Sequence, residues 1–199
     1  MYTIMNLIFA CDTNYGIGVN NRLPPWKLKG DLEKFSKLTI GSGNNVVIMG
    51  KNTYLSLPKN FLKNRCNIVI SKTLFTENCY DKFKITLSEK EIEYCIFNKT
   101  FIFNHLSDAY IYALNYTSFS KDNSFGEIWA IGGSTIYESA IELGLVNKIY
   151  LTFVKKNYIC DTYLGEKTIN FLDETKITNI QYFNHHLNDE HEFRVYEYR

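Results

Sequence analysis

Val46-Val47-Ile48-Met49-Gly50-Lys51-Asn52-Thr53 and Ile128-Trp129-Ala130-Ile131-Gly132-Gly133-Ser134-Thr135 are two stretches with the same pattern. In each, a short apolar run ends in glycine and then passes through hydroxyl residues into a helix-like segment. Such a junction presents free backbone N–H groups and the positive end of a helix dipole, which suit phosphate oxygens. Two junctions in one chain predict a sheet whose carboxyl edge holds a phosphorylated ligand.

The length and composition of the chain favour one globular domain. Its 199 residues include 45% hydrophobic residues, enough for a sizeable core. The formal net charge of +1 offers no basis for binding nucleic acid or an acidic membrane. No apolar run approaches the ~20 residues of a membrane helix, and the N-terminal run reads as a buried strand rather than a signal peptide. We therefore expect a soluble protein, which we take to be cytoplasmic and monomeric.

Cysteine and histidine placement argues against a metal site. The five cysteines form no Cys-x-x-Cys pair, so neither a disulfide framework nor a zinc site is expected. His185, His186 and His191 lie in a polar stretch without a supporting ligand motif, which predicts solvated surface.

Short apolar runs alternate with helical patterns along the chain. Most runs are continuous, as in strands covered on both faces, whereas the last alternates, as in an edge hairpin. One helix is expected to start near Gly30, one at Ser107-Asp108, and one at the capping-box spacing Thr135–Glu138 with Gly144 closing it. The strand candidates are 4–11, 45–49, 67–70, 128–131, 149–154 and 193–198. This pattern predicts the α/β class, with a largely parallel sheet and some antiparallel additions.

Residues 73–101 fit the pattern poorly. They mix aromatic residues and cysteines with many charges, and no turn divides them clearly. We interpret them as an insertion on a single domain spanning 1–199 rather than as a second domain.

Two familiar nucleotide motifs are absent. Gly16-Ile17-Gly18 lacks the third glycine of a dinucleotide fingerprint, and Pro24-Pro25 forbids a regular helix where that motif needs one. Gly50-Lys51 is followed by asparagine, so it is not a Walker A motif. The expected phosphate site must be of another kind.

Asp31 permits two readings. It sits in the first turn of an expected helix, where a carboxylate is a common partner of the helix dipole. Leu28, Leu32 and Phe35 supply an apolar face to the same helix. A carboxylate facing an apolar cleft would have a raised pKa, would pair with an amidine-like ring, and would help to deliver a proton.

The ordered motifs resemble those of the dihydrofolate reductase family over nearly the whole chain. Their order and spacing together are far more specific than any single motif. In chain order they are Ile8-Phe9-Ala10, Gly16-Ile17-Gly18, Leu23-Pro24-Pro25-Trp26, Asp31-Leu32-x-x-Phe35, Val47 to Thr53, Arg65, Ser71-Lys72, Ile131 to Tyr137, Thr152, Asp161-Thr162 and Phe193-x-Val195-Tyr196.

This resemblance implies a fold and an activity. The family folds as a single α/β domain, with a central eight-stranded, mostly parallel mixed sheet flanked by about four helices. It reduces 7,8-dihydrofolate to 5,6,7,8-tetrahydrofolate with NADPH, a step of one-carbon metabolism that the antifolate methotrexate blocks. Hydride passes to pterin C6, and N5 is protonated through water, while the protein supplies placement and water exclusion.

Carried over by position, the resemblance assigns roles to residues of the substrate site. Asp31 matches the pterin-binding carboxylate, and Thr152 would support the same pterin amino group. Arg65 matches the arginine that grips the substrate's glutamate, a bidentate task that lysine does poorly. Trp26 and Leu23 lie in the mobile loop 16–26 and join Asp31 as catalytic candidates. The substrate-binding candidates are Ile8, Phe9, Asp31, Leu32, Phe35, Leu57, Leu62, Arg65, Ile131, Tyr137 and Thr152.

The resemblance also assigns a cofactor site. The glycine junctions would let backbone approach the pyrophosphate, while Ser71 and Lys72 would contact the adenosine 2′-phosphate. Lys51 and Lys72 add positive charge, which predicts a preference for NADPH over NADH. The cofactor-binding candidates are Ala10, Ile17, Gly18, Gly50, Lys51, Asn52, Thr53, Ser71, Lys72, Ile131, Gly132, Gly133, Ser134, Thr135 and Ile136.

Three departures from the family pattern stand out. Pro24-Pro25 doubles the proline that precedes tryptophan, so Pro25 or Trp26 fills the tryptophan position, and we favour Trp26. Asn52 and Asn104 stand where relatives carry a base, which weakens the expected grip on the 2′-phosphate. The stretch 161–165 lacks the usual Phe-Pro ending, which we interpret as a structural change.

Two other functions share features with this sequence. A related reductase of flavin synthesis acts on a ribosylated pyrimidine and shares the glycine-rich turns, but Asp31, Phe35 and Arg65 favour folate. A binding module that has lost turnover would keep the fold, and the intact Asp31 and Thr152 argue against it.

Overall fold

The computed structural model describes residues 5–26, 28, 30–58, 61–74, 100–118, 126–182 and 191–197, with only the backbone of 176–182. These residues form two β-sheets and five helices. The expected insertion falls mainly on 75–99, outside the described residues. At its edges, Thr73 lies in a turn and Thr100 already begins a strand of the main sheet, so 73–101 is too wide.

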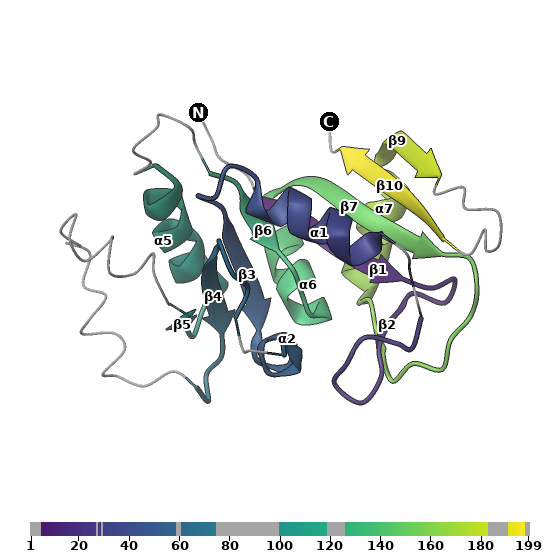
Figure 1. Cartoon of the computed structure of the whole chain (residues 1–199), viewed down its shortest axis with the longest axis horizontal. Helices are drawn as coiled ribbons and strands as arrows, with labels where there is room; N and C mark the ends of the chain where they lie inside the picture. The colour runs from purple at the N-terminus through teal and green to yellow at the C-terminus, as the bar shows by residue number, and fades with distance from the viewer. Residues whose placement is uncertain are drawn as a thin grey trace.

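An eight-stranded mixed sheet forms the centre of the structure, in the order β5-β4-β3-β6-β1-β7-β10-β9 (Figure 1). Neighbours from β5 to β7 pair in parallel, whereas β10 pairs antiparallel with both β7 and β9. The strands are β1 Met5–Cys11, β3 Val46–Gly50, β4 Cys66–Ile70, β5 Thr100–Phe103, β6 Ile128–Ala130, β7 Val146–Val154, β9 Lys176–Tyr182 and β10 His191–Glu197. A two-stranded sheet pairs β2 (Gly16–Gly18) with β8 (Thr162–Tyr163). The predicted fold class is confirmed.

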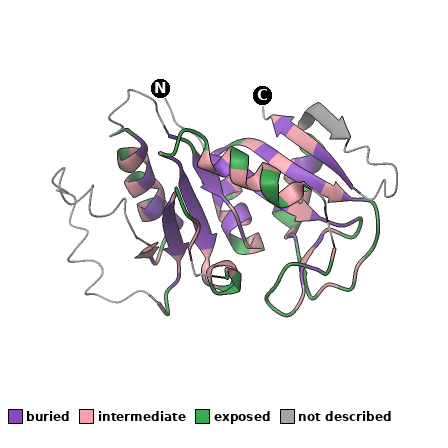
Figure 2. Cartoon of the chain, viewed as in Figure 1, coloured by how far each residue is buried: buried purple, intermediate pink, exposed green. Residues whose placement is uncertain are grey.

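Helices cover both faces of the large sheet, as the continuous apolar strands required. On one face, α1 (Asp31–Ile40) and α2 (Lys51–Ser56) pack on an apolar cluster built around Val47, Met49 and Trp129. On the other, α5 (Leu106–Ser118), α6 (Ser134–Glu142) and α7 (Glu166–Glu174) pack on the larger core. The strands between these layers are buried in Figure 2, while the outward side of α1 is exposed. The described residues thus hold five helices, one more than expected.

The start of α6 corrects one local prediction. Gly133, rather than Thr135, is the N-cap residue, and no side chain caps the helix. The hydroxyl of Ser134 instead accepts a hydrogen bond from the Gly165 backbone N–H at 2.8 Å. The helix therefore begins one residue before the expected capping box. Its end agrees with prediction, because Gly144 adopts a φ of 64° just beyond the last turn.

The predicted surface histidines give a divided result. His185 and His186 lie outside the described residues, whereas His191 is only 9% exposed and its prediction as solvated surface is wrong. It begins β10, whose pairing with both β7 and β9 draws it into the sheet. Within the described ranges, no three His, Cys, Asp or Glu side chains gather as a metal site would require, and no helix has the length and apolar character to cross a bilayer.

Candidate active site

The residues singled out by the sequence come from neighbouring strands and meet at one edge of the sheet. In sheet order, β7 contributes Thr152, β1 contributes Ile8 and Ala10, the turn after β6 contributes Gly132, and β3 ends at Gly50. Because the strands from β4 to β7 are parallel, these positions lie toward their common carboxyl edge. The edge therefore carries these five residues as one row.

Asp31 occupies one end of this row. It is the first residue of α1, which begins after Gly30 in a left-handed conformation (φ 81°). Thr152, a buried residue of β7, donates a hydrogen bond from Oγ1 to Asp31 Oδ1 at 2.5 Å. Ala10 of β1 is the register partner of Thr152, which places it beside this contact.

Burial raises the pKa of Asp31 above its usual value, although the Thr152 hydrogen bond and the positive charges of His191 and Lys34 oppose the rise. This rise reflects the position of Asp31, which is half-buried and not fully exposed to solvent. A raised pKa was predicted from the sequence for a carboxylate that helps to deliver a proton.

An apolar cluster lies on the same face of the sheet as Asp31. Its buried members come from β1, β3, β4 and β6, and partly buried side chains from α1, α2 and the loop before β4 pack against them. Five of the substrate-binding candidates belong to it: Ile8, Phe35, Leu57, Leu62 and Ile131.

Two leucine candidates are exposed and do not join this cluster. Leu32 is 69% exposed and Leu23 is 61% exposed. The prediction that Leu32 lies on one apolar face of the helix with Phe35 is therefore wrong for packing on the sheet, whereas its role in substrate binding stays a prediction. Three residues span about 300° of helix, so Leu32 and Phe35 lie some 60° apart; the helix leans on the sheet through Phe35 and Leu38.

Arg65 is held close to Phe35 of that cluster. Its Nη1 donates to Thr39 Oγ1 at 2.7 Å, its Nε donates to the Lys63 carbonyl at 3.0 Å, and its guanidinium carbon lies 5.9 Å from the Phe35 ring centroid. Burial lowers the pKa of Arg65 from its usual value. Thr39, which sequence reasoning missed, lies one turn after Phe35 and is fully buried; that spacing was the signal for it.

The buried amide of Asn67 orders the loop that presents Leu62 and Arg65. Its Oδ1 accepts a hydrogen bond from the Leu62 N–H at 2.8 Å, and its Nδ2 donates to the carbonyls of Leu62 and Arg65, each at 2.9 Å. A polar residue inside an apolar strand was the overlooked signal, because a buried amide must find partners.

The two glycine junctions lie against each other in the middle of the row. Strand β3 runs into α2 and strand β6 leads to α6, and the two strands are parallel neighbours. The Gly50 N–H donates to the Gly132 carbonyl at 2.7 Å, and the Ile131 N–H donates to the Ile48 carbonyl at 2.9 Å. Two helix N-termini thus open at one place, and the Gly132–Gly133 peptide between them is cis.

Gly132 fits this place because it lacks a side chain. Its φ is 112°, and a Cβ there would lie 2.8 Å from the Tyr137 hydroxyl and 3.5 Å from Thr53 Oγ1. Tyr137 is buried, its ring packs on Phe9 with centroids 4.8 Å apart, and its hydroxyl donates to the Ile8 carbonyl at 3.2 Å. Phe9 therefore packs toward the α6 side, away from the Phe35 cluster.

A polar group built on Thr73 forms the far end of the row. Lys51 Nζ donates to Thr73 Oγ1 at 2.8 Å, and the hydroxyls of Ser71 and Thr73 lie 3.3 Å apart. Lys72 is exposed beside them. Sequence reasoning paired Ser71 with Lys72 and missed Thr73, because the contact with Lys51 spans two strands.

Other cofactor candidates differ in exposure. Asn52 and Thr135 are exposed in the first turns of α2 and α6, Ile136 is buried and faces Gly50, and Ser134 uses its hydroxyl on Gly165. Asn104 is half-buried just after β5.

The loop after β1 is tied to the loop after β7. Asp12 is fully buried; its Oδ1 accepts the Gly16 N–H at 2.8 Å and its Oδ2 the Tyr158 N–H at 2.8 Å. Farther along, Asp161 Oδ2 accepts the Asn20 N–H at 2.7 Å, and the Asp161 N–H donates to the Gly18 carbonyl at 3.0 Å.

Asp12 was not predicted from the sequence as a functional residue, although an acid directly after a buried strand could have indicated it. Ile17, between the two anchored glycines, packs against the larger core.

Trp26 closes this loop against the same region. Its ring meets Tyr158 edge-on, with centroids 5.7 Å apart. Pro25 is exposed and Pro24 is buried. The half-buried Trp26 is thus the residue of the pair that packs, in keeping with its preferred assignment to the tryptophan position, which stays a prediction.

Comparison with known proteins points to one family. Residues 4–199 match the family model described as "Dihydrofolate reductase". The chain is 31% identical over 209 residues to a dihydrofolate reductase of Heliothis virescens, covering 97% of this chain and 96% of that protein. It is 32% identical over 183 residues to a putative dihydrofolate reductase of Caenorhabditis elegans, covering 89% and 84%. A bifunctional dihydrofolate reductase-thymidylate synthase of Paramecium tetraurelia is 31% identical over 188 residues, which span 92% of this chain but 34% of that protein.

Gly132→Ala tests the close packing at the glycine junction. We expect it to destabilise the protein more than Gly144→Ala, the control. Both residues have positive φ, but a Cβ at Gly144 meets nothing within 4 Å. Strain at such a φ costs of order 1–3 kcal/mol at either site, and only Gly132→Ala adds a clash with Tyr137. Urea unfolding measures both; equal losses would mean that the contact carries no weight.

The raised pKa of Asp31 predicts a pH-dependent stability. A folded-state pKa above the unfolded one means that the folded protein binds the proton more tightly, so stability falls as pH rises through the folded pKa. In Asp31→Asn this dependence is removed. The unfolding free energy of Asp31→Asn minus that of the wild type should therefore become more positive from acid to neutral pH. Parallel urea titrations measure it, and a shift in the opposite direction would contradict the prediction.

Proposed function

The chain belongs to the dihydrofolate reductase family, and we propose that it reduces 7,8-dihydrofolate to 5,6,7,8-tetrahydrofolate with NADPH as the reductant. Membership makes it an oxidoreductase. The observation that carries the proposal is the row at the carboxyl edge of the sheet. The half-buried Asp31 lies at one end of the row, and Lys51 with the hydroxyl groups of Ser71 and Thr73 lies at the other. The two glycine junctions lie between them.

Asp31 and its surroundings suit the pterin. A half-buried carboxylate pairs with neighbouring N–H donors such as an amino group and a ring nitrogen, and Thr152 already holds one of its oxygens at 2.5 Å. The apolar cluster with Phe35, Leu57 and Leu62 offers a surface for the pterin and benzoyl rings. Arg65, fixed beside Phe35, would bind the glutamate carboxylate at the other end of the substrate.

The residues of the glycine junctions fit a dinucleotide. A Cβ at Gly132 would collide with Tyr137, so only glycine fits in this turn, and the backbone N–H groups at the starts of α2 and α6 suit a pyrophosphate. Gly50 and Thr53 at α2, with Gly133 to Thr135 at α6, would hold the pyrophosphate. Lys51, Ser71 and Thr73 are grouped where an adenosine 2′-phosphate would need a cation and hydroxyls.

The chemistry divides between cofactor and protein. NADPH, when bound, supplies the hydride that becomes the new C6–H bond of the pterin, and a proton reaches N5 from water. Asp31 holds the pterin by its amino group and N3, and its raised pKa suits an acid that assists that proton transfer. The loops joined by Asp12 and Asp161 would exclude other water from the reacting atoms. The monomeric and cytoplasmic states expected from the sequence stay predictions.

A steady-state assay tests the function. Protein mixed with NADPH and dihydrofolate should bleach the absorbance of the reduced nicotinamide, and methotrexate should stop the reaction. NADPH binding without bleaching would favour the binding module instead. Bleaching only with a ribosylated pyrimidine would favour the reductase of flavin synthesis.

Asp31→Asn tests the acid. Turnover should fall by roughly two to four decades near neutral pH, the usual scale of lost acid–base assistance, while the affinity for NADPH stays nearly unchanged. Glu33→Gln is the matched control, since Glu33 is an exposed acid on the same helix. Unaltered turnover in Asp31→Asn would remove Asp31 from this role.

Lys51→Met tests the cofactor preference. Charge-assisted hydrogen bonds contribute about 1.5–3 kcal/mol, so the KM for NADPH should rise by roughly tenfold or more, while the KM for NADH changes little. Lys63→Met serves as the control because Lys63 is exposed in the loop before β4. Equal losses with both cofactors would show that Lys51 does not read the 2′-phosphate.

A further inference from the structure

A second contact fastens α1 to the sheet one turn beyond Asp31. The Lys34 ammonium lies 3.4 Å from the centroid of the Phe193 ring in β10. A cation placed over an aromatic face at this distance is attracted by the ring quadrupole, more strongly where water is excluded. Lys34 is only partly exposed, and Phe193 is buried.

The two contacts of α1 are made to neighbouring residues of the sheet. Phe193 and Thr152 are register partners in the antiparallel pairing of β10 with β7, so their side chains lie on the same face of the sheet. Thr152 holds Asp31, and Phe193 holds Lys34. Asp31 and Lys34 are three residues apart, which makes them neighbours on the surface of α1. The helix is thus attached at two points one turn apart to two adjacent strands.

We infer that Lys34 is a positioning residue for Asp31: its seat on Phe193 keeps α1 aligned with Thr152 and keeps a positive charge beside the catalytic carboxyl group. This inference rests on the proposed function of Asp31 as the pterin-binding acid. It assigns Lys34 no contact with the substrate or with the cofactor.

The charges around Asp31 support this role. The groups acting on it are Thr152 from β7, His191 from β10 and Lys34 from α1. Burial raises the pKa of Asp31, and the positive charge of Lys34 lowers it. In turn, burial lowers the pKa of Lys34 and the charge of Asp31 raises it. Each group thus favours the charged form of the other in a partly dry place.

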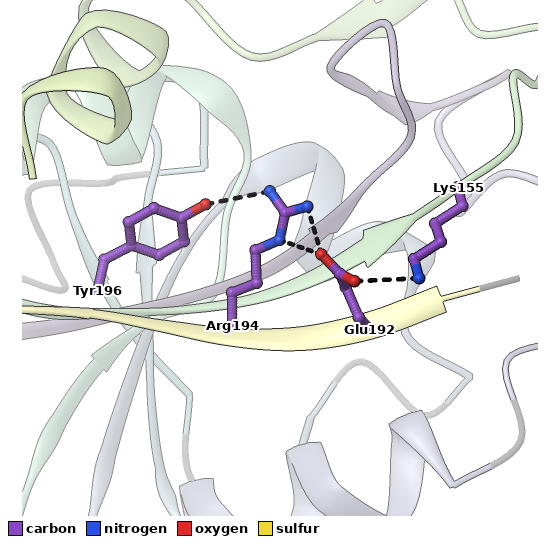
Figure 3. Close-up of polar contacts among 4 residues, drawn as sticks. All are labelled: Lys155, Glu192, Arg194 and Tyr196. Carbon is purple, nitrogen blue, oxygen red and sulfur yellow. Dashed lines mark hydrogen bonds and ion pairs between the residues drawn. The ribbon is translucent and has the colours of Figure 1, made fainter. Parts of the chain in front are cut away.

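Two charged side chains of β10 belong to the opposite face, and Glu197 at the end of the strand pairs with Lys148 at 2.6 Å. Glu192 and Arg194 flank Phe193 in the strand, and successive side chains alternate between faces. Figure 3 shows them joined in a network of their own. Glu192 pairs with Lys155 at 3.1 Å and with Arg194 Nε at 2.5 Å, and the Arg194 guanidinium carbon lies 4.0 Å from the Phe153 ring centroid. Lys34 and His191 are therefore the basic side chains that act on Asp31 among the described residues.

Lys34→Met tests the inference, because methionine keeps much of the apolar stem and removes the charge. Lys34→Arg restores a cation that can lie over the ring, and Lys37→Met removes an exposed lysine from the same helix as the matched control. Phe193→Leu keeps Lys34 but removes the ring. The first readout is the pH profile of dihydrofolate turnover, and the second is a ¹³C NMR titration of the Asp31 carboxyl, assigned with Asp31→Asn.

Without the neighbouring cation, the pKa of Asp31 should rise, so in Lys34→Met the decline of turnover with pH should move to higher pH. At a pH within that decline, the turnover of each protein is divided by its own turnover at the acid plateau. This ratio should be about two- to fivefold larger in Lys34→Met than in the wild type, the scale of a close, partly buried charge. Phe193→Leu should shift the profile in the same direction by less, while Lys34→Arg and Lys37→Met should follow the wild type.

The two readouts separate this inference from the proposed function. A wild-type protein that does not reduce dihydrofolate would overturn the function, and the NMR titration would still decide whether Lys34 acts on Asp31. Identical Asp31 titrations in Lys34→Met and Lys37→Met would overturn the inference. So would a Lys34→Arg profile displaced as far as that of Lys34→Met, because it would point to packing rather than charge.

Discussion

The hydrogen bond from Thr152 Oγ1 to Asp31 Oδ1 joins the first residue of α1 to β7, at 2.5 Å. It opposes the burial that raises the pKa of Asp31, so the carboxyl group can stay half-buried at the sheet without losing its hydrogen-bond partner. The same attachment sets where α1 lies, and with it where Phe35 meets the apolar cluster and where Thr39 meets Arg65. The proposed pterin and glutamate contacts all depend on this position of the helix on the sheet.

The cofactor half of the row depends on a different constraint, the close approach of two backbones. Gly50 and Gly132 bond directly at 2.7 Å, and Tyr137 reaches past Gly132 to the Ile8 carbonyl. A side chain larger than hydrogen has no room at Gly132, where a Cβ would lie 2.8 Å from the Tyr137 hydroxyl. Both halves meet at β1, whose Ile8 bonds to the cofactor side and whose Ala10 pairs with Thr152 on the acid side. A shared central strand would place the two proposed ligands next to each other, as hydride transfer requires.

Particular elements show how far the sequence could be read. The β-strand and glycine pattern at 46–53 and 128–135 correctly predicted two junctions, since buried parallel strands need continuous apolar residues and tight turns need glycine. The capping box at Thr135 was wrong because α6 already begins at Ser134 with Gly133 as its N-cap, and the Ser134 hydroxyl bonds to Gly165, 31 positions away, instead of capping the helix. Leu32 was placed inward by its apolar character, yet the rotation of α1 is decided by Phe35, Leu38 and the Asp31 seat. Strand β5 was missed because its short run borders the poorly patterned stretch before it.

Local pattern by itself determined the α/β class, the glycine junctions, and, through the order of its motifs, the family and the candidate acid. These features follow from residue type and short spacing, which sequence records directly. Only the tertiary structure decided that Lys51 reaches Thr73, that Asp12 binds the backbone of Tyr158, and that Lys34 sits over Phe193. Each of these contacts joins segments brought together by sheet order and register, and a side chain's partner across such a distance is set by where the elements pack rather than by its own neighbours in the chain.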